Sequence, residues 1–145
     1  MSSQSDTTPD EYNDQIIDEF RANQGHVGGM WEGTPLLLLH NVGARSGVAR
    51  VNPVGYLPHE GRQVVFASNG GAPRSPSWYY NLKAQPNTRI EVGGETIEVI
   101  AHEATGEERE RLFEIGAARF PQLHEHARKT DRLIPVVVIT PRAAG

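Results

Sequence analysis

The chain has 145 residues, of which 37% are hydrophobic and 22% charged, and its formal net charge is −4. This length is enough for one domain with a substantial core, whereas the acidic balance argues against a general nucleic-acid-binding protein, which carries a basic excess. The sequence contains no cysteine, which excludes disulfides, thiolate metal ligands and a cysteine nucleophile.

No targeting or membrane-spanning segment is predicted. The apolar run in TPLLLLHNVG is far shorter than the roughly 20 residues that span a bilayer. The N-terminal stretch MSSQSDTTPDEYND has neither a basic region nor an apolar core, so it does not resemble a secretory signal. We therefore expect a soluble, cytoplasmic protein.

The first predicted element is a helix over residues 8–24. Thr8 is the expected N-cap, Pro9 suits the first helical position, and Glu11 can close a capping box. Apolar residues then recur at helical spacing, so one face of the helix is expected to cover a core. This face consists of Tyr12, Ile16, Ile17 and Phe20.

Six strands are predicted after this helix, because short apolar or alternating runs are separated by turn residues. Pro53 and Gly55 lie inside the second run and indicate a bulge or a barrel corner there. The two glycines after Val92 form the expected hairpin turn between the fourth and fifth runs. The six runs are residues 36–42, 50–57, 63–68, 88–92, 95–104 and 133–140.

Three further helices are expected after the first three strands. A helix begins near Pro76 in PSWYYNL. The run 105–120 repeats the capping-box pattern, with Thr105 as N-cap and Glu108 as its partner, and Pro121 ends it. A short helix follows in QLHEHARKT.

The order of these elements favours an antiparallel sheet. Short turns join the first three strands, whereas a parallel doubly wound sheet needs a helix between successive strands. We therefore expect a mainly β (α+β) protein, an antiparallel barrel with external helices. Residues 8–145 are expected to form this single domain, after a disordered N-terminus over 1–7.

Most catalytic motifs are missing from the sequence. There is no G-x-S-x-G, Walker, H-E-x-x-H or G-x-G-x-x-G motif. The six histidines lack metal-ligand spacing; His124 and His126, two residues apart, would point to different faces of a helix. We therefore predict no metal site.

One segment with anion-binding chemistry is GARSGVAR, a turn between two strands that supplies Arg45, Ser46 and Arg50. Glycines let a backbone approach an anion, a hydroxyl and free amides donate hydrogen bonds, and arginine forks match phosphate or carboxylate. On its own, this pattern is also that of an ordinary basic hairpin turn.

Two more segments lie close together in the sequence. In ASNGGAP, Ser68 and Asn69 stand at a strand end and two glycines expose backbone amides. In PSWYYNL, the start of a helix favours the binding of anions. The aromatic residues Trp78 and Tyr79 that follow either pack against a planar ligand or fill the core. Together the three segments predict a site for a flat, polyanionic molecule that would itself supply the reactivity.

The region from Leu36 onward resembles the deazaflavin-dependent nitroreductase family, the quinone- and nitro-reducing enzymes of mycobacteria and their relatives. The resemblance rests on the combination SNGGAP, P-x-WYYNLKA-x-P and TDR-x-IPVVV. It implies an FMN-binding-like split β-barrel that binds reduced cofactor F420, a 5-deazaflavin with a phospholactyl-oligoglutamate tail. It also implies hydride transfer from C5 of the deazaflavin to a small acceptor, a quinone, an enone or a nitro compound.

The resemblance further implies which residues hold the cofactor. The phosphate and glutamates of the cofactor tail are expected to be bound by Arg45, Ser46 and Arg50, with Lys83 as a further contact. The backbone of β-strand residues is expected to line the ring, other residues to run along its edge, and the start of a helix to complete the pocket. These three sets are Val51, Asn52 and Pro53; Phe66, Ala67, Ser68 and Asn69; and Ser77, Trp78, Tyr79 and Asn81.

Three residues are the predicted catalytic groups. Ser68 is expected to donate a hydrogen bond to the negative charge that develops on the acceptor oxygen. The final proton is expected from solvent, Tyr56 or His126. Some relatives carry tyrosines over the substrate where this chain has Phe120, Leu123 and His126, so the identity of the acceptor is left open.

The sequence leaves two alternatives open: a split-barrel oxidoreductase that prefers FMN, and a carrier or sensor that binds F420 without turnover. The expected partners are a small-molecule acceptor and no nucleic acid. A lipid-soluble quinone would allow peripheral contact with the inner face of the cell membrane, and the self-capped helices favour a monomer.

Overall fold

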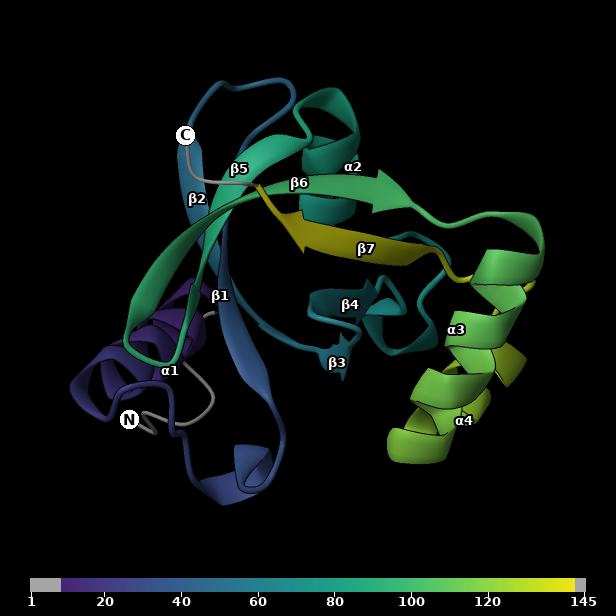
Figure 1. Cartoon of the computed structure of the whole chain (residues 1–145), viewed down its shortest axis with the longest axis horizontal. Coiled ribbons are helices and arrows are strands. Elements are labelled where there is room, and N and C mark those ends of the chain that lie inside the picture. Colours follow the sequence, from purple (N-terminus) through teal and green to yellow (C-terminus); the bar gives the residue numbers. More distant parts are fainter. Residues whose placement is uncertain (1–8, 143–145) are drawn as a thin grey trace, which may run out of the picture.

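A computed structural model describes residues 9–142 (Figure 1). Its four α-helices are α1 (Pro9–Ala22), α2 (Ser77–Ala84), α3 (Gly106–Arg119) and α4 (Gln122–Arg128), and its two short 3₁₀ turns are η1 (Gly29–Trp31) and η2 (Asn69–Gly71). Its seven strands are β1 (Leu36–Val42), β2 (Ala49–Gly55), β3 (Leu57–His59), β4 (Arg62–Phe66), β5 (Asn87–Val92), β6 (Glu95–Glu103) and β7 (Val136–Pro141). Within residues 9–142, no helix is long and apolar enough to cross a membrane.

The seven strands form one antiparallel sheet in the order β2-β1-β5-β6-β7-β4-β3, curled into a half-barrel (Figure 1). Helix α1 lies outside β1 and β2, α2 packs against β1, and α3 and α4 pack together beyond β7 and β4. The expected antiparallel barrel with external helices is therefore confirmed.

Strand β1 is a continuous apolar run because both of its faces are covered. Leu37 and Leu39 point into the barrel, where they join the inner core. Leu36 and Leu38 point the other way, against Phe20 of α1. Burying Leu36–Leu39, each at most 5% exposed, removes apolar surface from water on both sides of one strand.

The register of β2 against β1 sorts the residues of β2 between the two faces. Asn52 lies opposite Leu39 and Val54 opposite Leu37, so both belong to the inner face. Val51 packs against the α1 cluster on the outer face. Along the inner face of β2, Arg50, Asn52 and Val54 therefore follow one another.

The predicted strand over 50–57 is divided in the structure. Strand β2 ends at Gly55 and β3 begins at Leu57, because the backbone N–H of Tyr56 donates to the carbonyl of Pro35 (3.0 Å) instead of to a neighbouring strand. The corner that Pro53 and Gly55 indicated is thus present, and it adds a seventh strand to the six predicted.

The predicted helix caps differ from the structure or lie outside it. Thr8 and the Glu11 side chain fall outside the described residues. Thr105 occupies the N-cap position of α3, but its side chain makes no cap hydrogen bond. Gly106, with φ at 58°, redirects the chain there, and the Thr105 carbonyl accepts from Arg109 N–H (3.3 Å).

The last strand also begins later than predicted. β7 starts at Val136, whereas Leu133 is 69% exposed and lies in the connection from α4. Pro135 has no N–H to give a ladder, although its carbonyl accepts from Ala67 N–H (3.0 Å). This bond fixes the end of β4, just before Ser68, beside the connection.

Candidate active site

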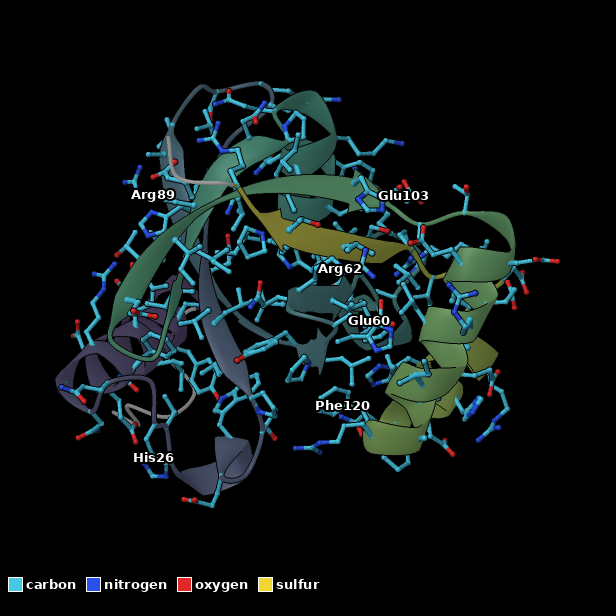
Figure 2. The ribbon with its side chains drawn as sticks, in the orientation of Figure 1. His26, Glu60, Arg62, Arg89, Glu103 and Phe120 are labelled. Atoms are coloured by element: carbon cyan, nitrogen blue, oxygen red, sulfur yellow. The ribbon has the colours of Figure 1, made fainter. Side chains whose placement is uncertain are left out.

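A cavity of about 210 Å³ opens where β2, β4 and the C-terminal helices meet. Its walls are mostly apolar and aromatic, and the polar groups Thr34, Gln122, Ser68 and His126 lie among them. Phe120, at the C-terminal end of α3, is one of the wall residues (Figure 2). The other apolar wall residues are Trp31, Val54, Gly55, Phe66 and Leu123.

Two of the three predicted catalytic residues come together in this cavity. The Nδ1 atom of His126, on α4, lies 3.2 Å from the hydroxyl oxygen of Ser68, which follows β4. Both side chains are half-buried. A hydroxyl hydrogen-bonded to an imidazole, within apolar walls, is a pair that can donate to an oxygen and supply a proton.

The segment that carries Ser68 is held by Arg132. The guanidinium of Arg132 donates to the carbonyl of Ser68 (2.8 Å) and to the carbonyl of Ala72 (2.9 Å). It also donates to the Ser75 hydroxyl (3.0 Å) and to the carbonyls of Ala67 and Arg74 (both 3.2 Å). The loop over 67–75 is irregular, so these carbonyls are not paired with a neighbouring strand. The single guanidinium of Arg132 supplies their hydrogen bonds instead.

A close approach of two backbones holds α4 against the same segment. Gly71 has φ at 87°, and a Cβ there would meet the carbonyl of His126 at 2.9 Å and the Cβ of Lys129 at 2.9 Å. Glycine is therefore required at this position both by its conformation and by the space. Asn69, with φ at 50°, directs its side-chain amide to the carbonyl of Arg74 (2.9 Å).

The predicted anion-binding loop is a tight, self-bonded turn. Gly43 N–H donates to the carbonyl of Val48 (2.9 Å), and Val48 N–H donates to the Ser46 hydroxyl oxygen (3.1 Å). Arg45, Ser46 and Arg50 are all exposed. No hydrogen bond or ion pair of Arg45 or Arg50 is found among residues 9–142, so their charges are available to an anion.

Arg50 also lines a larger polar cavity of about 410 Å³, which opens where β1 and β5 diverge. Arg89 and Arg142 are on the far side of it, and Arg89 points outward from β5 (Figure 2). Glu98 lies between them: it pairs with Arg142 (3.0 Å) and stands opposite Arg89 in the register of β5 and β6. The surface around Arg50 is thus basic but partly neutralised.

The residues of α2 lie away from the Ser68 cavity. Trp78 and Tyr79 are 8% and 7% exposed and belong to the barrel core. The Tyr79 hydroxyl donates to Glu103 (2.7 Å), and burial, followed by this hydrogen bond, raises the pKa of Tyr79. Lys83 places its ammonium 5.4 Å from the centre of the Tyr79 ring. A separate cavity of about 230 Å³ is lined by Tyr79, Lys83 and Glu103, and Trp78 is not part of its lining.

The third predicted catalytic residue, Tyr56, is half-buried against the barrel core and is not among the residues that line the Ser68 cavity. Burial raises the pKa of Tyr56, so its phenol keeps its proton at neutral pH. Of the other predicted ring contacts, Phe66 lines the cavity, Ala67 is buried in the barrel core and Ser77 is exposed at the start of α2. Pro53 lies opposite Leu38, on the outer face of β2.

Three residues that frame these features were not singled out from the sequence. Trp31 lines the cavity from η1, in a glycine-rich stretch that has no helical or strand periodicity. Arg132 belongs to the TDR motif, which indicated a family but no role. Asn41 is 4% exposed inside β1, and a buried amide at the end of a leucine run was the available signal.

The residues present suit a flat, anionic cofactor. The cavity is smaller than the ~300–1,000 Å³ of most ligand pockets, so it accommodates a ring system rather than a whole dinucleotide-sized molecule. Its apolar walls match an aromatic face, and Arg50 at the start of β2 and Arg45 in the preceding turn lie where a charged tail would emerge.

The fold is a split β-barrel, and the Ser68 cavity combines apolar walls with one serine–histidine pair. The model of the family described as F420H(2)-dependent quinone reductase matches residues 14–141. An F420H(2)-dependent quinone reductase of Mycobacterium tuberculosis is 36% identical over 130 residues, 85% of each chain. This chain belongs to the F420H(2)-dependent quinone reductase family.

Two solved structures agree with this assignment. One, an F420-H2 dependent reductase, is 38% identical with a TM-score of 0.66, over 72% of this chain and 93% of that one. The other, described as a domain-swapped dimer, is 32% identical with a TM-score of 0.69, over 91% of this chain and 99% of that one.

Proposed function

We propose that this protein reduces a quinone at the expense of reduced F420. The observation that carries the proposal is the His126–Ser68 pair, 3.2 Å apart, inside an apolar cavity at one end of β2 whose other end carries Arg50. When bound, reduced F420 supplies a hydride to the acceptor. The protein's own contribution is to hold ring and acceptor in one orientation and to exclude water.

In this proposal Ser68 stabilises the negative charge that develops on the acceptor oxygen. With its Nδ1 protonated, His126 donates to the Ser68 oxygen, which leaves the serine proton free to point into the cavity. A donor fixed in this way needs no reorganisation during the reaction. In its doubly protonated imidazolium form, His126 can pass the Nδ1 proton to Ser68 as Ser68 gives its own proton to the acceptor, and His126 is then left as neutral imidazole.

Arg45, Ser46 and Arg50 are the proposed contacts of the anionic tail. They stand on the exposed turn after β1 and at the start of β2. The two guanidiniums are free to bind phosphate or carboxylate in the two-pronged way that arginine favours. Lys83, whose ammonium lies over the Tyr79 ring in a separate cavity, is a more distant proposed contact.

Enones and nitro compounds stay predicted acceptors beside quinones. On the side of the C-terminal helices, the cavity is lined by Phe120, Leu123 and His126. An apolar acceptor such as a quinone therefore fits better than a strongly polar one. Tyr56, which lies outside this wall, is the less favoured proton source.

The proposal is tested by titrating the purified protein with F420 and with FMN, following the fluorescence of each ring. Menadione is then added to the complex with reduced F420. We expect tight binding of F420, weaker binding of FMN, and rapid reoxidation. Preference for FMN would contradict the proposal, and tight F420 binding without reoxidation would make the protein a carrier.

The oligomeric state is measured alongside, by light scattering during size-exclusion chromatography. The relative described as a domain-swapped dimer lends no support to the expected monomer. A dimer that binds F420 equally well would leave the proposed reaction unchanged.

A further inference from the structure

The side-chain amides of three asparagines form a hydrogen-bonded chain. This chain joins the turn over 43–48, which carries Arg45, to strand β2. The backbone N–H of Ala44 donates to Oδ1 of Asn81 on α2 (2.9 Å), and Nδ2 of Asn81 donates to Oδ1 of Asn41 on β1 (2.8 Å). Nδ2 of Asn41 then donates to Oδ1 of Asn52 on β2 (2.9 Å) and to the carbonyl of Leu39 (3.2 Å).

The two backbone groups fix the direction of this amide chain. The Ala44 N–H is a donor, so Asn81 must offer its oxygen there and its NH₂ group to Asn41. The Leu39 carbonyl is an acceptor, so Asn41 must turn its NH₂ group toward Leu39 and Asn52. Asn52 therefore accepts with its oxygen and presents its NH₂ group at the free end of the chain.

Burial makes this direction costly to reverse. Asn41 is 4% and Asn81 6% exposed, and a buried amide without a partner costs free energy comparable to a lost hydrogen bond. Rotating any one amide would place two donors or two acceptors face to face. The Asn52 NH₂ group, by contrast, has no hydrogen-bond partner among residues 9–142, and the Asn52 side chain is half-buried.

The position of Asn52 says what this free donor would meet. Asn52 lies on the inner face of β2, between Arg50 and Val54, and Val54 lines the Ser68 cavity. At about 3.3 Å per residue, four residues of strand cover ~13 Å. A ligand with its ring in the cavity and its anionic end at Arg50 would therefore pass over Asn52.

From this geometry we infer that Asn52 is a donor to a hydrogen-bond acceptor at the edge of the bound ring, a carbonyl oxygen or an unprotonated ring nitrogen. Asn41 and Asn81 are positioning residues that act through Asn52. The same chain also ties the Ala44 turn, beside Arg45, to the strand under the ring. This inference rests on the proposed function, because it takes the ring and tail to be those of a deazaflavin.

The test uses the whole protein labelled with ¹⁵N and the deazaflavin head without its phosphate tail, so that the arginines do not contribute. Side-chain NH₂ resonances and backbone amides are followed during the titration. We expect the Asn52 NH₂ resonances to shift with the backbone signals of the Ser68 cavity, and the NH₂ groups of Asn41 and Asn81 to exchange slowly with solvent.

Variants separate the donor from its supports. Asn52→Asp keeps the acceptor for Asn41 and replaces the free NH₂ group by oxygen, so we expect a roughly 5- to 10-fold loss of affinity for the head with an unchanged melting temperature. Asn41→Leu leaves Asn52 in place but frees its amide to rotate, and we expect a smaller loss. Asn23→Leu, an exposed amide after α1, is the control and should bind as the natural protein does.

Two outcomes would overturn the inference while the proposed function stands. The first is a shift of the Ser68 cavity signals without a shift of the Asn52 NH₂ resonances. The second is full affinity in Asn52→Asp or Asn41→Leu. If no resonance responds to the head or to complete F420, the proposed function fails, and the inference fails with it.

Discussion

Ser68 and His126 are 58 residues apart in the sequence, yet the serine hydroxyl oxygen and the histidine Nδ1 lie 3.2 Å apart. The contact exists because α4 packs directly on η2, where Gly71 leaves room for the His126 carbonyl. Neither residue is held by its own element alone. The pair therefore depends on the docking of two segments that are separated in the sequence by α2, β5, β6 and α3.

The pair is expected to contribute to turnover more than to cofactor binding. Ser68→Ala removes a donor aimed at the acceptor oxygen, and we expect kcat for menadione to fall by ~10²-fold. His126→Gln keeps polarity but cannot supply a proton, so a fall of ~10-fold or more is expected. Steady-state kinetics and F420 titration measure the two effects separately.

The control for these variants is His124→Gln. His124 is on the same helix but is exposed, with its ring 5.9 Å from the Phe113 ring and outside the cavity. It should keep full turnover. A Ser68→Ala variant with unchanged kcat would remove Ser68 from the mechanism.

A glycine on α3 determines the shape of the cavity wall. A Cβ on Gly116 would overlap the ring of Phe66, which lines the cavity. Overpacking of this kind costs about 1–3 kcal/mol, while alanine gains back up to ~1 kcal/mol of helix propensity. We expect Gly116→Ala to lower the free energy of unfolding by ~1–2 kcal/mol and to weaken F420 binding.

Urea denaturation and F420 titration test this prediction. Gly94→Ala is the matched control, because the nearest atom to a Cβ there is a side-chain carbon of Gln24 at 3.9 Å. An unaltered midpoint in Gly116→Ala would mean that Phe66 moves aside without cost.

Much of the architecture could be predicted because it depends on residues that are close together in the sequence. The run Leu36–Val42 was predicted with its observed bounds, since an apolar strand flanked by turn residues leaves few alternatives. The hairpin at Gly93 and Gly94 follows from alternation and a glycine turn. The family motifs added the split barrel, which local patterns alone left as one of several antiparallel barrels.

The site was harder to predict because its contacts are not local. Arg132 reaches back about 60 residues to Ala72 and Ser75, and nothing in its own neighbourhood in the sequence indicates those partners. Asn41 and Asn81 likewise meet across 40 residues. Which face of α2 turns toward the core is likewise decided by contacts with residues distant in the sequence. Trp78 is therefore found in the core and not beside Ser68.

Arg132 is expected to stabilise the loop over 67–75. Arg132→Ala would strip hydrogen bonds from four carbonyls and one hydroxyl. We expect the free energy of unfolding to drop by ~2–3 kcal/mol, since hydrogen bonds to charged groups contribute about 1.5–3 kcal/mol each but solvent replaces some of them here. Arg132→Lys should restore part of the loss.

Hydrogen exchange makes this prediction specific. Gly71 N–H donates to the Ser68 carbonyl (2.9 Å), and its exchange should accelerate in Arg132→Ala more than that of the β5–β6 hairpin. Equal acceleration everywhere would indicate a global loss of stability and no particular role in the loop.

Glu91 is expected to make part of the stability pH-dependent. Hydrogen bonding from Arg21, the largest effect, and from His40 holds the pKa of Glu91 below 4.5, although burial opposes them. The folded protein therefore binds fewer protons here than the unfolded chain does. The resulting stability is present above pH ~4.5 and is lost as the pH falls through the lower pKa of the folded state.

Denaturation at pH 7, 4 and 3 tests this dependence. Glu91→Gln should lose ~1 kcal/mol at pH 7, since the bond from Arg21 is two-pronged (3.0 and 2.7 Å) and partly shielded, and its deficit should shrink at low pH. Glu98→Gln, which breaks the more exposed pair with Arg142, is expected to change little at any of these pH values. A deficit in Glu91→Gln that is constant with pH would assign its effect to packing instead.

Arg50 is expected to bind the charged tail and not the ring. Arg50→Ala should weaken F420 binding ~10-fold or more at low salt, because a charge-assisted bond to phosphate or carboxylate is lost, while the head without its tail should bind as before. The deficit should narrow as salt rises, since screening weakens the natural contact as well. Arg111→Ala, an exposed arginine of α3, is the matched control and should leave both affinities unchanged. If Arg50→Ala lowered the affinity for the head and for F420 equally, Arg50 would act on the ring end of the site, and the proposed course of the tail along β2 would be wrong.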